Sequence, residues 1–186
     1  GRTTGIALEA QGAGCACLIS GSGVAVCHTQ RVLLPRCNAV SAKLLEHIDG
    51  LLLRHGLCAS ACCAVWDGSG RIELANAGDT MGVVVGAGGT RFLCVPRTGP
   101  RQRLWRYAGS GRLTSTTMER YTVNITAADR YLVLMTSEIW ERLSMPSIER
   151  IAWTRKTPED ASAALVAAAR AYQGRANAAA VVIRLS

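Results

Sequence analysis

The chain has 186 residues, of which 49% are hydrophobic and only 5% aromatic, and its formal net charge is +8 at pH 7. This length supports one substantial hydrophobic core, built mainly from Val, Leu, Ile, Ala and Cys, so we expect a single domain over residues 1–186. No apolar run approaches the roughly 20 residues of a membrane-spanning helix, and we therefore expect no membrane insertion.

The first third of the chain predicts a strand, a glycine-rich turn and a helix. Residues 14–20 are a short apolar run typical of a strand, and Ser20-Gly21-Ser22-Gly23 follows it as a turn. Asn38 is positioned to cap a helix that ends near Gly56. The apolar residues that recur there at helical spacing are Val40, Leu44, Leu45, Ile48, Leu51 and Leu52. This pattern gives the helix one apolar face.

The middle of the chain predicts four strands in two hairpins. The expected strands are residues 57–66, 71–77, 81–85 and 90–95. Asp67-Gly68-Ser69-Gly70 has the turn chemistry of the first hairpin, and Gly88-Gly89 that of the second. Because each strand follows the previous one closely, we expect one antiparallel meander.

The last third predicts further strands and two helices. Strands are expected at residues 121–125, 131–135 and 178–185, with the start of a helix at 137–143. Thr157 is a typical helix cap, Pro158 suits the first helical position, and the helix should run to Gly174. Strands that alternate with a few helices favour an α+β layered domain.

The eight cysteines are interpreted as reduced, buried side chains. They are Cys15, Cys17, Cys27, Cys37, Cys58, Cys62, Cys63 and Cys94, and most lie inside apolar stretches. Their spacing is not that of a zinc site, and neither Cys15 with Cys17 nor Cys62 with Cys63 makes an easy disulfide. The histidines His28, His47 and His55 are scattered, so we expect no metal role for them. Reduced thiols favour a reducing intracellular compartment, the cytosol or the mitochondrial matrix.

An arginine-rich segment is the main candidate for binding a partner. No Asp or Glu occurs between residues 91 and 112, and the segment contains Arg91, Arg97, Arg101, Arg103, Trp105, Arg106, Tyr107 and Arg112. Arginines interleaved with aromatic residues suit RNA or an acidic protein surface. The same composition is equally typical of a solvated loop with a short helix, and both interpretations stay open.

Four segments carry motifs in a fixed order: residues 19–24, 75–80, 129–141 and 176–183. Together they resemble the protein phosphatase 2C family of metal-dependent serine/threonine phosphatases. In that family the segments read as a strand ending in Asp-Gly-His-Gly-Gly before a helix, Ala-Asn-x-Gly-Asp-Ser, Asp-x-Phe-Leu-Ile-Leu-Ala-Ser-Asp-Gly-Leu-Trp-Asp, and Asp-Asn-Ile-Thr-Val-Val-Val-Val. The match covers nearly everything from about Glu9 onward. It implies an α+β fold, a shortened β-sandwich of two antiparallel sheets with helices outside.

The resemblance also implies where the metal ligands should be, and carboxylates are missing there. Active members hold two Mg²⁺ or Mn²⁺ ions between the sheets, and such ions need carboxylate ligands. The four aspartate positions fall on Ala10, Ser20, Ser137 and Ala176, and the family's phosphate-binding arginine falls on Gly5. We therefore expect no metal, no cofactor and no catalytic residue, that is, a pseudophosphatase.

The acidic residues that remain have structural interpretations. Asp79 and Asp129 fall at positions that resemble turn residues of the family, where their side chains would cap tight turns. Glu9 and Glu138 would rebuild a single-metal site only if Glu138 faced inward beside Ser137. The loop at residues 20–23 lacks the outer glycine of a nucleophile elbow, and is more typical of a simple turn than of a phosphate cradle.

Three functions remain as hypotheses. The first is a structural or scaffolding subunit of a larger assembly, such as a ribonucleoprotein, with partner contacts at Arg97, Arg101, Arg103, Trp105, Arg106 and Arg112. The second is a regulatory adaptor for a kinase or phosphoprotein, and the third is a residual metal-dependent phosphatase. The first residue, Gly1 instead of Met, fits removal of a targeting segment, and it equally fits a sequence whose leading residues were trimmed or left out.

Overall fold

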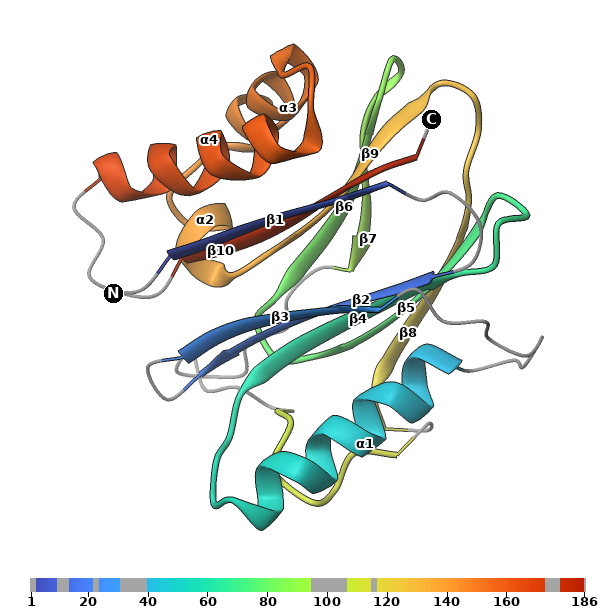
Figure 1. The fold of residues 1–186 in the computed structure, drawn as a ribbon, viewed down its shortest axis with the longest axis vertical. Coiled ribbons are helices and arrows are strands. Elements are labelled where there is room, and N and C mark those ends of the chain that lie inside the picture. Colours follow the sequence, from blue (N-terminus) through green and yellow to red (C-terminus); the bar gives the residue numbers. More distant parts are fainter. Residues whose placement is uncertain are drawn as a thin grey trace.

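Two β-sheets packed face to face, with helices on both outer faces, make up the fold in the computed structural model (Figure 1). The structure describes residues 3–9, 14–21, 24–30, 40–94, 107–114, 117–172 and 178–185. The strands are β1 (Thr3–Glu9), β2 (Gly14–Gly21), β3 (Val24–Gln30), β4 (Ser60–Trp66), β5 (Arg71–Ala77), β6 (Met81–Gly86), β7 (Gly89–Cys94), β8 (Glu119–Asn124), β9 (Asp129–Met135) and β10 (Ala178–Arg184). The helices are α1 (Val40–Arg54), α2 (Ser137–Trp140), α3 (Met145–Thr154) and α4 (Pro158–Ala171).

Among the residues that the structure describes, each sheet contains five strands. The first has the order β1-β10-β9-β6-β7, and β1 runs parallel to β10 while the other pairs are antiparallel. The second is entirely antiparallel, in the order β3-β2-β4-β5-β8. The expected α+β sandwich is confirmed, with one parallel pair that the sequence pattern did not predict.

The predicted meander is wrong at one step. Strands β5 and β6 follow each other closely in sequence, but β5 pairs with β8 in one sheet and β6 pairs with β9 in the other. The chain therefore crosses between the sheets at residues 78–80. Both strands have apolar residues on two faces, so their patterns fit either sheet.

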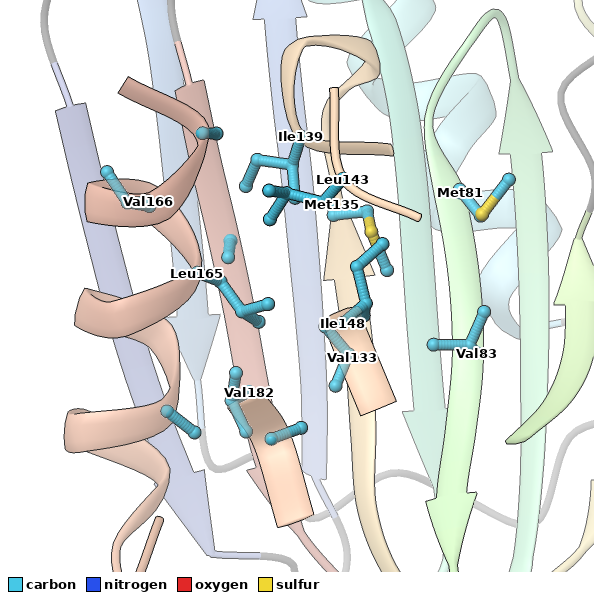
Figure 2. Close-up of a cluster of buried hydrophobic side chains, with 14 of the residues drawn as sticks. Met81, Val83, Val133, Met135, Ile139, Leu143, Ile148, Leu165, Val166 and Val182 are labelled. Carbon is cyan, nitrogen blue, oxygen red and sulfur yellow. The ribbon is translucent and has the colours of Figure 1, made fainter. Parts of the chain in front are cut away.

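The core between the sheets is aliphatic, as the composition predicts. It is formed by buried residues of both sheets, among them Leu18, Cys62, Leu74, Val84, Leu134 and Val181. A second cluster lies under α2, α3 and α4 on the outer face of the first sheet (Figure 2). There Ile139, Ile148 and Leu165 of the helices pack against Val133 and Val182 of the strands. Apolar burial on both faces of the sheets is the main stabilising contribution to this fold.

Helix α1 covers the outer face of the second sheet (Figure 1). Ala42, Leu45 and Ile48 belong to one buried cluster with strand residues that include Cys17 and Cys63. The helix ends as predicted, because Gly56 adopts a φ of 64° and the backbone N–H of Leu57 donates to the carbonyl of Leu52 at 2.9 Å. Asn38, the predicted cap, lies outside the described residues.

Helix α4 begins at the predicted position but ends at Ala171, before the predicted Gly174. Thr157 caps α4, since its side chain accepts a hydrogen bond from the backbone N–H of Asp160 at 3.1 Å. Helix α2 ends at Trp140, three residues before the predicted Leu143.

Strands β1 and β3 and helix α3 were not predicted. The segment after Gly23 continues as a strand, where the phosphatase resemblance implied a helix. None of the helices in the described residues is long and apolar enough to cross a membrane.

Candidate functional site

Ser20 and Ser137, two of the four residues that the motifs assign to metal-carboxylate positions, lie at the same end of the sandwich. Ser20 is directly opposite Ser60 in the pairing of β2 with β4. The hydroxyl of Ser60 accepts a hydrogen bond from the backbone N–H of Asp79 at 3.1 Å, and the carbonyl of Asp79 accepts one from the indole of Trp140 at 2.8 Å. Trp140 and Ser137 belong to the same short helix, α2. Ala10 and Ala176, the other two positions, lie outside the described residues.

The Gly78-Asp79 step of the motif is held in place by packing. Gly78 adopts a φ of 109°, a conformation that L residues rarely adopt. A Cβ atom at this position would lie 2.3 Å from the Ser60 hydroxyl oxygen. Only glycine allows the chain to pass this close to β4 as it crosses between the sheets.

Buried polar groups at this end bond to one another. Asn76 and Thr80 are 1% and 0% exposed, and the Thr80 hydroxyl donates to the Asn76 side-chain oxygen. Thr136 is also buried, and its hydroxyl accepts a hydrogen bond from the backbone N–H of Ala179 at 3.2 Å. These bonds fix the crossing segment, the end of β9 and the start of β10. Asn76, Thr80 and Thr136 therefore have a structural role.

Glu9 and Glu138, the acidic residues next in sequence to the assigned positions Ala10 and Ser137, do not lie together at this end of the sandwich. Glu138 accepts a hydrogen bond from the guanidinium of Arg142, four residues later, at 2.6 Å. Glu9 pairs in register with Arg184, which is opposite Tyr131 at the start of β9. The strand from Tyr131 to Met135, about 13 Å long, therefore separates Glu9 from the end that carries Glu138. The strand register therefore does not bring Glu9 and Glu138 together to share a single-metal site.

The donor set at the Ser20 and Ser137 end does not fit two divalent metal ions. Mg²⁺ and Mn²⁺ require several anionic oxygen ligands, whereas these two positions offer neutral hydroxyls. Within the part of the chain that the structure describes, no cluster of three or more His, Cys, Asp or Glu side chains is placed to hold a metal.

Asp129 has the capping role predicted for it. Its carboxylate accepts hydrogen bonds from the backbone N–H of Thr126 at 2.8 Å and from the Thr126 hydroxyl at 2.9 Å. It also forms an ion pair of 2.5 Å with Arg91. Burial alone would raise the pKa of Asp129, but the bonds from Thr126 and Arg91 outweigh it and hold the pKa below its ordinary value.

Asp79 was also predicted to cap a turn, but the contacts that place it are made by its main chain. Its N–H donates to Ser60 and its carbonyl accepts from Trp140. The main chain of Asp79, on the path that Gly78 permits, makes these contacts, and its carboxylate does not take part in them.

Asp49 was missed by the sequence analysis and holds a loop against α1. It is 4% exposed, and one carboxylate oxygen accepts backbone N–H bonds from Gly109 at 2.6 Å, Ser110 at 2.9 Å and Gly111 at 3.2 Å. The other oxygen accepts a bond from Leu113 at 3.4 Å. A signal was present, because Asp49 lies four residues after Leu45 on the apolar face of the predicted helix.

The arginine-rich segment is described only at its two ends. Arg91 lies in β7 and pairs with Asp129, so it serves the protein's own fold. Arg112 is exposed on the loop held by Asp49. The predicted binding residues Arg97, Arg101, Arg103, Trp105 and Arg106 lie outside the described residues.

The prediction of buried thiols is confirmed for five cysteines and wrong for one. Cys15, Cys17, Cys62, Cys63 and Cys94 are buried and not in disulfides. Cys58 is exposed, because it lies before the first residue of β4 and not inside the strand as predicted. Cys37 and the side chain of Cys27 lie outside the described part.

Comparison with solved structures shows the same fold in bacterial phosphatases. A bacterial serine phosphatase matches with a TM-score of 0.69 and 14% sequence identity, over 84% of this chain and 74% of that one. The serine/threonine phosphatase Stp1 of Staphylococcus aureus matches with a TM-score of 0.67 and 14% identity, over 82% of this chain and 70% of that one. PstP/Ppp of Mycobacterium tuberculosis matches with a TM-score of 0.64 and 15% identity, over 78% and 72%.

These matches confirm the phosphatase 2C-like fold that the motifs predicted. At this level of identity the likeness concerns the fold, and it carries no statement about activity. No protein-family model and no curated protein matches the sequence.

Proposed function

We propose that this chain is a pseudophosphatase, a phosphatase 2C-like domain that has no metal-dependent catalysis and acts as a structural, scaffolding subunit of a larger assembly. The observation that carries the proposal is the pair of neutral hydroxyls, Ser20 and Ser137, at one end of the sandwich where the resemblance places metal-binding aspartates. The fold is retained there by main-chain and side-chain bonds that need no metal.

Electrostatics supports this choice over a residual phosphatase. A pair of divalent cations loses much of its hydration in a protein site, and anionic oxygens must offset that loss. Serine hydroxyls supply no negative charge, Glu138 is already paired with Arg142, and Glu9 lies at the far end of its sheet. Ala10 and Ala176, as assigned by the motifs, would add no ligand.

The net positive charge of the chain favours an acidic partner. We propose that this partner includes RNA, as in a ribonucleoprotein. The net charge is +8, and Arg112 is exposed on a loop that Asp49 holds in a defined position. Arg97, Arg101, Arg103, Trp105 and Arg106, which precede this loop, are the proposed contact residues. Reduced thiols in the core support an intracellular reducing compartment, cytosol or mitochondrial matrix.

A regulatory adaptor is the second candidate, and one comparison favours it. PppA of Pseudomonas aeruginosa, described as a key regulatory component of a type VI secretion system, matches with a TM-score of 0.63 and 14% identity over 77% of this chain. An adaptor would bind a phosphoprotein or kinase at the Ser20 and Ser137 end, whereas the scaffold proposal uses the basic segment.

Hydrolysis of p-nitrophenyl phosphate with and without Mn²⁺ tests the loss of catalysis. We expect no metal-stimulated turnover, and titration calorimetry with Mn²⁺ alone should show no binding with the stoichiometry of a two-metal site. Metal-stimulated turnover by the purified chain would overturn the proposal.

Isolation of the native assembly tests the scaffold role. We expect co-purification with RNA or with acidic proteins, and charge reversal at Arg101, Arg103 and Arg106 should release the chain from its assembly. Binding that weakens steeply with salt would identify RNA, because phosphate contacts release counterions. Salt-insensitive association with a single phosphoprotein would favour the adaptor instead.

A further inference from the structure

Cys17 and Cys63 face each other across two neighbouring strands. They are directly opposite in the antiparallel pairing of β2 with β4, and their sulfur atoms are 2.6 Å apart. Both are buried, with 3% and 0% exposure. They lie in the cluster under α1, with Leu45 of that helix in the same cluster.

The arrangement is selective for this pair of thiols. Cys15 lies two residues earlier on the same face of β2, but its register partner is Val65. Cys62 lies on the opposite face of β4 from Cys63. It belongs to the core between the sheets, where its side chain interacts with Cys94. Directly opposed residues on paired strands have the shortest separation of their Cβ atoms, which is the geometric requirement for a disulfide.

We propose that Cys17 and Cys63 form an oxidisable dithiol site, which a two-electron thiol oxidant such as a peroxide converts into a cross-strand disulfide. In the first step one thiolate attacks a peroxide oxygen, an S–O bond forms, the O–O bond breaks, and water leaves after protonation. In the second step the other thiolate attacks that sulfur, the S–S bond forms and the S–O bond breaks. Two thiols and one hydrogen peroxide thus give one disulfide and two waters.

The surroundings of Cys63 set the conditions for this reaction. Burial and the hydrogen bond with Cys17 raise the pKa of the Cys63 thiol well above its ordinary value. Because the thiolate is the reacting form, oxidation in the folded protein should be slow near neutral pH and faster at alkaline pH. The product would join residues 46 positions apart in sequence and fix β2 to β4 directly beneath α1.

Peptide mapping of the purified full chain tests the proposal. The folded protein is treated with hydrogen peroxide at pH 7 and pH 9, quenched with N-ethylmaleimide in denaturant, and digested without reduction. We expect linked Cys17 and Cys63 as the dominant disulfide of β2, formed faster at pH 9. Fragment spectra assign the linked sulfur, and parallel oxidation in guanidinium should instead give mixed pairings.

Three variants act as matched controls. Cys15→Ala and Cys62→Ala remove the neighbouring thiols and should keep the link, whereas Cys17→Ala should abolish it and leave Cys63 alkylated. Oxidation should also raise the urea midpoint of the wild-type chain and of Cys15→Ala, with no such shift in Cys17→Ala.

Two results would overturn the proposal. One is a link from Cys63 mainly to Cys15 or Cys58, and the other is full alkylation of Cys17 and Cys63 after oxidation at pH 9. Peptide mapping of the oxidised wild-type chain decides the question even if Cys17→Ala does not fold. Phosphatase assays do not enter the test, so its outcome is independent of the proposed function.

Discussion

The indole N–H of Trp140 donates a hydrogen bond of 2.8 Å to the main-chain carbonyl of Asp79. This bond joins the helix that follows β9 in one sheet to the segment where the chain enters that sheet from the other. It connects two of the motifs that carry the phosphatase resemblance, and it does so through a structural contact. The motif residues Asp79 and Trp140 are therefore explained by their contacts within the fold.

Replacing Trp140 with Phe should destabilise the protein by about 1–2 kcal/mol, because the partly buried carbonyl of Asp79 loses its donor and the smaller ring leaves space. Urea unfolding followed by circular dichroism measures this difference. The matched control is Trp153→Phe, since Trp153 is 40% exposed and its loss should cost less. Equal effects of the two substitutions would contradict the role given to the Trp140 bond.

Replacing Asp49 with Asn should release the loop at residues 107–114 from α1. The neutral side chain loses the charge-assisted bonds to backbone N–H groups, a loss of about 1.5–3 kcal/mol. We expect faster hydrogen exchange at Gly109 to Gly111 and faster trypsin cleavage after Arg112. Asp67→Asn, in an exposed hairpin turn, is the control and should leave this loop unchanged. Unaltered exchange in Asp49→Asn would show that other contacts hold the loop.

Asp129 should make stability depend on acidic pH. Its pKa is lower in the folded state than the ordinary value of about 3.9, so the folded state favours the ionised form. The resulting stabilisation is complete above the unfolded pKa, and it is lost as the pH falls through the lower folded pKa. Between pH 5 and pH 2, the urea midpoint of the wild-type chain should therefore fall more than that of Asp129→Asn.

Arg91→Gln serves as the companion variant in that titration. It removes the ion pair but keeps both bonds from Thr126, so its acid sensitivity should lie between those of the wild type and Asp129→Asn. The effect of Arg91 should be modest because its side chain is 45% exposed. Parallel pH profiles for the wild type and Asp129→Asn would rule out the contribution of this carboxylate.

Gly78→Ala should be among the most damaging single substitutions in the chain. The added methyl group would meet Ser60 at the crossing between the sheets and would also require a positive φ, with a cost on the order of 3 kcal/mol. Gly88→Ala is the control, because a Cβ atom there has no neighbour within 4 Å. Thermal unfolding compares them, and a stable Gly78→Ala protein would contradict the packing described for this turn.

Local patterns in the sequence predicted most of the elements. Helical spacing placed α1, the Thr157-Pro158 pair placed the start of α4, and turn residues placed the hairpins β4–β5 and β6–β7. The four motifs in order predicted the fold class. These predictions succeeded because propensity, capping and periodicity depend on residues that are close in sequence.

The candidate site was predicted only in part. Serine at residues 20 and 137 can be read from the sequence, but their position at one end of the sandwich follows from strand register and from the Ser60, Asp79 and Trp140 bonds. The strand register likewise places Glu9 at the other end of the sandwich from Ser20 and Ser137. A pattern of alternating residues says which face a side chain occupies, and it does not say where along a sheet its neighbours lie.

The sequence by itself determined most of the elements, the fold class and the neutral character of the assigned metal positions, because these depend on local spacing and on residue identity. Tertiary structure alone decided that the chain changes sheets after β5, that Asp49 binds a loop 60 residues away, and that Cys17 meets Cys63. These are contacts between segments distant in sequence, and they are fixed by which strands pair and in which register.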